Sequence, residues 1–227
     1  MEIMLETFLP KERLLDFSVT TVLVLTWYLS VKSTIKEKTE KRLSWILTLL
    51  SAIVSTFGCI PVVYDGFVKG FPNDIMYGND RISRGLVNFF VCYLLWDTVF
   101  IYTDYPSIGG IHHHLPYFIF MAFSLHYRCP AMFVVFMPME LSSIFLSVGH
   151  IWPPYRVDLW FGITFFFGRI VYHFLLWLRL YSTRGDSPFL VWPFALLPLA
   201  VHIQWFTKWL MSMYKKYKEN RRKARGN

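Results

Sequence analysis

Three consecutive histidines open one apolar run of the chain, and an aspartate lies inside the apolar run before it. The histidines are His112, His113 and His114, and the aspartate is Asp97. A neutral imidazole near a carboxylate can accept and release protons near neutral pH, or act as a nucleophile. Such a group could therefore do acid–base or nucleophilic chemistry. The sequence leaves open whether the protein is an enzyme.

Further ionisable side chains lie deep inside other apolar runs. Glu140 and Arg169 fall near the middle of theirs, and His202 lies in the last one. A charge inside lipid is costly, so each such residue needs a partner or a function. We expect Glu140 to contact Arg169, because opposite charges at equal depth lower each other's burial cost. These positions predict a polar cavity that opens toward the cytosol, although a buried ion pair that only fixes helix register is equally compatible.

The composition indicates that lipid is the main solvent of these runs. Of the 227 residues, 55% are apolar and 17% are charged, whereas soluble domains carry about 25% charged residues. Disorder, a coiled coil and a typical soluble enzyme are therefore excluded. In lipid, every backbone group must be satisfied within its own segment, so long apolar runs should be helices. The runs cover residues 14–31, 43–64, 86–102, 111–125, 131–151, 159–180 and 189–210.

This pattern predicts an all-α fold, a polytopic transmembrane helix bundle with seven spans. Six spans are the alternative, because the fourth run is shorter than the about 20 residues that a span needs. We expect residues 1–13 to be a lumenal or extracellular N-terminus, residues 14–213 to form the transmembrane domain, and residues 214–227 to be a basic cytosolic tail.

Cations set the expected orientation. Of the 23 Lys and Arg residues, five lie between Lys32 and Arg42 and seven lie in the last 13 residues. Both segments should face the cytosol, and six spans between them would return the chain to the same side. A tail that faces anionic headgroups explains the net charge of +8 more simply than nucleic acid does. We expect an integral membrane protein of the endoplasmic reticulum or the plasma membrane.

Several other chemistries lack their sequence patterns. The cysteines Cys59, Cys92 and Cys129 are scattered, which favours neither a disulfide framework nor a zinc site. No two histidines are three or four residues apart, as di-iron desaturase boxes require, and no G-x-S-x-G, P-loop or dinucleotide motif occurs. We therefore expect no metal and no resident cofactor.

Three fragments in a fixed order resemble a known membrane domain. They read Tyr93-Leu-Leu-Trp-Asp97, Ile111-His-His-His-Leu-Pro116 and Met139-Glu-Leu-Ser-Ser-Ile-Phe-Leu146. Together they resemble the TLC domain, which translocating-chain-associating protein shares with the longevity-assurance ceramide synthases. The resemblance covers about residues 40–215 and is strongest to the small TLC-domain-containing proteins.

The resemblance implies roles for individual residues. His113 and His114 match the family's paired histidines, Asp97 matches its Y-x-x-x-D helix, and Glu140 with Ser142 matches its E-x-S/T helix. In ceramide synthases such residues line an intramembrane cavity and support acyl transfer from acyl-CoA to a sphingoid-base amine. With the residues at membrane depth, the expected lipid-binding set is Tyr93, Asp97, His112, Glu140, Ser142, Arg169, His173 and His202.

The chain also departs from the ceramide synthase pattern. Tyr117 stands where a Thr follows the histidines, and the stretch before Glu140 lacks the family's Asp residues. Ser51 replaces a His of the small members, and Ile144 replaces a Pro. These differences weaken the resemblance to a ceramide synthase and leave the resemblance in fold intact.

The sequence thus supports three functions. The first is a role in sphingolipid or phospholipid homeostasis, with a cavity that binds an acyl chain or a sphingoid base. The second is an acyl-CoA-dependent N-acyltransferase that takes acyl-CoA as co-substrate, for which the resemblance implies His113, His114 and Asp97 as catalytic residues. The third is a lipid or ion transporter. Membrane lipids are the expected partners, and a homo-oligomer stays open.

Overall fold

The described part of the chain is helical, as the apolar runs predict. The computed structural model describes residues 11–108, 111–187 and 189–225, and it describes their side chains except for residues 11–15, 111–113 and 224–225. Every regular element in these ranges is a helix, which confirms the all-α fold class. The chain divides into two compact units, Met1–Asp158 and Leu159–Asn227.

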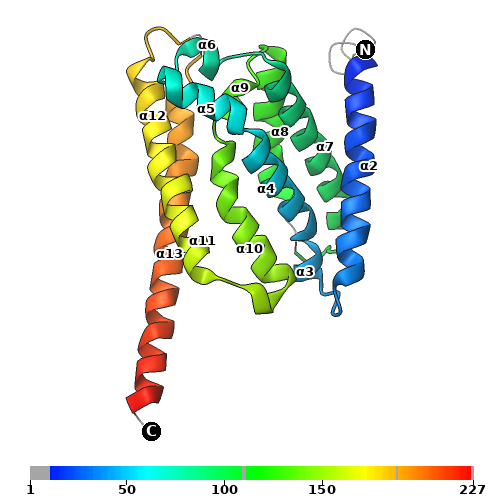
Figure 1. The fold of residues 1–227 in the computed structure, drawn as a ribbon, viewed down its shortest axis with the longest axis vertical. Coiled ribbons are helices and arrows are strands. Elements are labelled where there is room, and N and C mark those ends of the chain that lie inside the picture. Colours follow the sequence, from blue (N-terminus) through cyan, green and yellow to red (C-terminus); the bar gives the residue numbers. More distant parts are fainter. Residues whose placement is uncertain (1–10, 109–110, 188, 226–227) are drawn as a thin grey trace. The chain divides into compact units, whose positions relative to one another are not determined.

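Three long helices, α2, α4 and α7, and the broken fifth run form most of the first unit (Figure 1). α7 begins after Asp80, whose carboxylate accepts a hydrogen bond from the backbone N–H of Ser83 at 2.8 Å. The elements are α2 (Lys11–Thr34), α3 (Glu40–Leu43), α4 (Ile46–Gly58), α5 (Ile60–Lys69), α6 (Asn73–Met76), α7 (Arg81–Thr103), α8 (Ile111–His126), α9 (Ala131–Val134), the 3₁₀ turn η1 (Met137–Glu140), α10 (Leu141–Ile151) and η2 (Pro153–Tyr155).

α7 is the central helix of this unit, because α2, α4, α8 and α9 all pack against it. The ring of Tyr28 on α2 stacks on Phe100 of α7 with 3.9 Å between ring centroids. At the end of α7, the Asp104 carboxylate pairs with Lys32 and accepts a hydrogen bond from the Tyr28 hydroxyl at 2.6 Å. Partial burial raises the pKa of Asp104, but the contacts with Lys32 and Tyr28 outweigh it and hold that pKa below its usual value.

The second unit contains α11 (Asp158–Phe165), the π-helical segment η3 (Phe166–Tyr172), α12 (His173–Ser182) and α13 (Trp192–Arg225). The first residue of α11, Asp158, is the last residue of the first unit. α12 lies beside the first half of α13 (Figure 1). Gly162 of α11 faces the indole of Trp209, and a Cβ at Gly162 would lie 2.1 Å from its nearest ring atom. The absence of a side chain at Gly162 therefore lets the indole of α13 lie against α11.

Four helical stretches of the described residues are long and apolar enough to cross a membrane. They are Glu40–Lys69, Asn73–Thr103, Ala131–Ile151 and Asp158–Ser182. α8 has only 16 residues, and polar residues lower the mean hydropathy of α13. The structure therefore supports a multi-span membrane protein, whereas the count of seven spans stays a prediction.

Two details differ from the sequence-based expectation. The stretch 65–84, which lies between the second and third apolar runs, contains the end of α5, the short helix α6 and the first turn of α7, because Asp80 caps α7 several residues before its apolar part. The fifth run is also not one regular helix. Its 3₁₀ turn carries Pro138, and a proline cannot donate the backbone hydrogen bond that a continuous α-helix requires.

The cysteines are small packing residues in this structure. Cys59, Cys92 and Cys129 are buried free thiols. Burial raises the pKa of Cys129, which lies between α8 and α9, to about 11. Its thiol therefore stays protonated at neutral pH and is a poor nucleophile.

Candidate functional site

Asp97 of α7 and His114 of α8 form a buried carboxylate–imidazole pair. Asp97 Oδ2 lies 3.1 Å from His114 Nε2, and the two residues are 6% and 1% exposed. The structure thus brings together two of the three predicted catalytic residues. The side chain of the third, His113, lies outside the part of the chain that the structure describes, as does that of His112.

Thr98 of α7 contacts the other nitrogen of the His114 ring. The oxygen of its hydroxyl lies 2.7 Å from the carbonyl of Leu94 and 2.8 Å from His114 Nδ1. Thr98 therefore lies against Nδ1 of the ring, and the Asp97 carboxylate lies against Nε2.

Asp97 Oδ2 and His114 Nε2 lie 3.1 Å apart in a buried site. A carboxylate beside an imidazole can orient the ring and balance the charge of its protonated form. The arrangement is therefore one that acid–base chemistry can use.

Tyr105 completes this group, although it was not among the residues predicted from the sequence. Its hydroxyl donates to Asp97 Oδ1 at 2.6 Å, and the residue is 1% exposed. Tyr105 follows the end of α7, so the chain must turn back to bring its ring to Asp97. Helical periodicity cannot predict such a contact, and the only available signal was a tyrosine eight residues after a buried aspartate.

Three other predicted site residues belong to the first unit. Tyr93 is buried one helical turn before Asp97 on α7. Glu140 ends the 3₁₀ turn η1. Ser142 is buried on α10, where its hydroxyl donates to the carbonyl of Met139 at 3.2 Å. Tyr93 therefore lies beside Asp97 on the same helix, whereas Ser142 is bonded locally.

The predicted residues of the second unit form a polar group within that unit. His173 Nε2 lies 2.9 Å from the carbonyl of Ala195, and His202 Nδ1 lies 3.2 Å from the carbonyl of Arg169. Because carbonyls only accept, each of these nitrogens carries a proton. His202 Nε2 can then accept from Arg169 Nη1 at 3.2 Å, and His173 Nδ1 can accept from His202 Nδ1 at 3.4 Å. Both imidazoles therefore fit the network in their neutral form.

The backbone around Arg169 is unusual. Arg169 belongs to the π-helical segment η3, and π-helical turns inside α-helices occur often at functional sites. The wider turn places both its carbonyl and its guanidinium against His202 of α13. The structure thus brings together Arg169, His173 and His202, three of the predicted lipid-binding residues.

Two expectations join residues of different units and stay predictions. These are the Glu140–Arg169 contact and the single cavity shared by all the polar residues at membrane depth. Within the ranges that the structure describes, no group of three or more His, Cys, Asp and Glu side chains lies close enough to hold a metal ion.

The sequence matches the TLC domain family over residues 42–214. The match covers more than half of the chain, so the protein belongs to the TLC domain family, as the resemblance predicted. The family and the apolar helices define an integral membrane protein with a role in lipid metabolism or homeostasis. Comparison with curated proteins and with solved structures gave no match.

Proposed function

We propose that the protein acts in sphingolipid or phospholipid homeostasis by binding the polar end of a membrane lipid beside Asp97 and His114. The observation that carries this proposal is the buried carboxylate–imidazole pair, with Tyr105 on the other carboxylate oxygen. Such groups are costly inside a bilayer and persist where they serve a function. A sphingoid base suits the pair, because its amine can donate to Asp97.

Access to the pair is expected to come from α8. His114 is 1% exposed, so a ligand can reach it only after a movement. Pro116 lies inside α8, two residues after His114, and it cannot donate to the carbonyl of His112. The first turn of α8 is therefore weakly held and is the part we expect to move when lipid enters.

The carboxylate–imidazole geometry also favours a second candidate, acyl transfer to an amine. A neutral His114 would take the proton as the amine nitrogen attacks the thioester carbonyl of acyl-CoA. The new C–N bond forms, the C–S bond breaks, and the thiolate of CoA receives a proton. Asp97 would orient the imidazole and balance its positive charge.

We place the protein in the endoplasmic reticulum or the plasma membrane, with its C-terminus in the cytosol. The cations of the tail support this orientation. A thioester donor made in the cytosol would then approach from the side of the tail.

Lipid mass spectrometry on gently purified protein tests the proposal. Wild-type protein should retain a defined lipid, and Asp97→Ala or His114→Ala should change or remove it. Ser124→Ala is the matched control, because Ser124 is also buried on α8 but bonds only to the carbonyl of Met121. If all variants retain the same lipids, the proposed binding role is wrong.

The same preparations separate the two candidates. Labelled acyl-CoA is supplied with sphingoid-base and lysolipid acceptors, and product is measured. Turnover that His114→Ala abolishes and Ser124→Ala preserves would identify an acyltransferase. Retained lipid without turnover by wild-type protein would identify a binding protein.

A further inference from the structure

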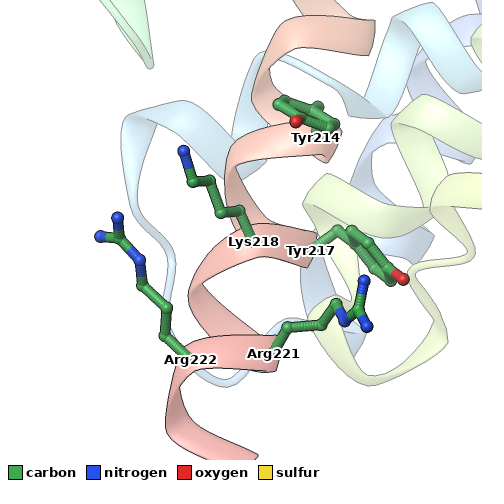
Figure 2. A pocket seen from close by; sticks show the side chains of 5 residues that line it. All are labelled: Tyr214, Tyr217, Lys218, Arg221 and Arg222. Atoms are coloured by element: carbon green, nitrogen blue, oxygen red, sulfur yellow. The ribbon is translucent and has the colours of Figure 1, made fainter. Parts of the chain in front are cut away.

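The last turns of α13 carry a basic and aromatic face. Tyr214, Tyr217, Lys218, Arg221 and Arg222 follow the spacing i, i+3, i+4, i+7 and i+8, which places them on one side of a helix. They line a shallow hollow, and Figure 2 shows their side chains around it. We call these five residues the tail face.

Part of the tail face is already ordered for binding an anion. The guanidinium of Arg221 lies 5.7 Å from the ring centroid of Tyr217, a cation–π distance. This contact holds the guanidinium in place and leaves its N–H groups available to a ligand. A guanidinium fork matches the oxygens of a phosphate group better than a lysine ammonium does.

The position of the tail face along α13 indicates which ligand it meets. Leu210 and Met211, just before it, are exposed apolar residues on the same continuous helix. At 1.5 Å per residue, Lys218 to Arg222 lie about 10 to 17 Å beyond Met211. The headgroup layer extends only about 5 to 8 Å beyond the hydrocarbon, so small headgroups end before these cations, whereas a headgroup with several phosphates reaches them.

We propose that the tail face is a binding site for a membrane lipid whose headgroup carries several phosphates. Tyr214, about 4 to 5 Å beyond Met211, lies at the level of the membrane interface, where tyrosine is enriched, and Tyr217 lies just outside it beside the cations. Lys218, Arg221 and Arg222 contact the phosphates that project from the surface. This site lies outside the Asp97 group and does not depend on the function proposed for it.

A binding titration tests the site on the full chain in neutral detergent. The probe is dioctanoyl phosphatidylinositol bisphosphate, with dioctanoyl phosphatidylcholine and free inositol trisphosphate as comparisons. Lys218→Gln with Arg221→Gln removes two charges from the tail face. Lys216→Gln with Lys223→Gln removes two charges from the opposite side of the same helix, and is the matched control.

We expect the first pair of substitutions to weaken binding of the anionic lipid by about tenfold or more and the control pair by about threefold or less. Tyr217→Ala should weaken binding, and Tyr217→Phe, which keeps the ring, should not. Circular dichroism checks that each variant is folded. We expect all of them to fold, because the substituted side chains are exposed. Equal losses in the two pairs would overturn the site, because they indicate diffuse attraction. Equal affinity for the lipid and free inositol trisphosphate would overturn the assignment to a lipid.

Discussion

At the scale of single residues, Asp97 is the clearest polar feature of the first unit. Its carboxylate has Tyr105 on one oxygen and His114 on the other. A buried charge without such partners would be strongly destabilising. The two contacts therefore explain how an ionisable group persists in the interior of a helical membrane protein.

Removing the hydroxyl of Tyr105 should show how much the protein's stability depends on the Tyr105–Asp97 hydrogen bond. Tyr105→Phe leaves Asp97 Oδ1 without its donor, and we expect a loss of about 1 to 3 kcal/mol in stability. Thermal unfolding of the purified protein measures it. Tyr102→Phe is the control, because Tyr102 is 68% exposed near the same end of α7. Equal stability of the two variants would show that the Tyr105–Asp97 bond contributes nothing.

The contacts of Asp104 predict a dependence of stability on acid. Its pKa in the folded protein lies below the usual value, because Lys32 and Tyr28 outweigh the effect of partial burial. The stabilisation is therefore complete above the unfolded-state pKa of about 4 and is lost as the pH falls through the folded-state value.

The substitution Asp104→Asn should reduce the loss of stability that occurs as the pH falls. Unfolding midpoints measured from pH 6 down to pH 3 should fall less steeply in the variant than in wild type. Asp65→Asn, which removes an exposed carboxylate paired with Lys69 on the same helix, is the charge-matched control. Parallel curves for wild type and Asp104→Asn would contradict the contribution of Asp104.

The sequence predicted part of this site. Asp97 and His114 were predicted because they are ionisable residues inside apolar runs. Such residues are costly in lipid and occur there mainly where they have a function. Tyr105 and Thr98 could not be found in the same way, since both residue types are common in and around membrane helices. Their roles depend on a chain reversal after α7 and on the rotation of α8, which no local pattern specifies.

At the scale of elements, the apolar runs located the helices but not their interruptions. The second run divides at Cys59 into α4 and α5, next to Pro61, and the sixth contains the π-helical segment η3. Hydropathy averages over such breaks. The helix of the seventh run, α13, also continues through the basic tail to Arg225. The tail contains no proline or glycine up to that residue.

The approach of α11 to α13 depends on Gly162. Gly162→Ala places a methyl group against the indole of Trp209, and we expect a loss of about 1 to 3 kcal/mol from this overpacking. Gly85→Ala is the matched control, because nothing lies within 4 Å of a Cβ at Gly85 in α7. The control should gain up to about 1 kcal/mol in helix stability. Denaturation of both variants measures the difference, and a Gly162→Ala protein as stable as wild type would contradict this packing.

At the scale of the whole molecule, the number of spans decides the side of each terminus. Seven spans place the two ends on opposite sides of the membrane, and six place them on the same side. Epitope tags at both ends, probed after selective permeabilisation of the plasma membrane, distinguish the two counts. We predict that only the C-terminal tag is accessible from the cytosol. Access to both tags would favour six spans.

Family membership and the Asp97–His114 pair together connect the molecule to lipid chemistry. The family match assigns the class of protein, and the pair supplies a group inside the helices that can hold or move a proton. The central claim is that this pair is required for the effect of the protein on membrane lipids.

Quantitative lipid analysis of cells that express equal amounts of wild type, Asp97→Ala, His114→Ala or Ser124→Ala tests that claim most directly. We predict that wild type and Ser124→Ala change the sphingolipid or phospholipid profile in the same way, and that Asp97→Ala and His114→Ala leave it as in cells without the protein. An unchanged profile with wild type, or the same change with all four proteins, would contradict the claim.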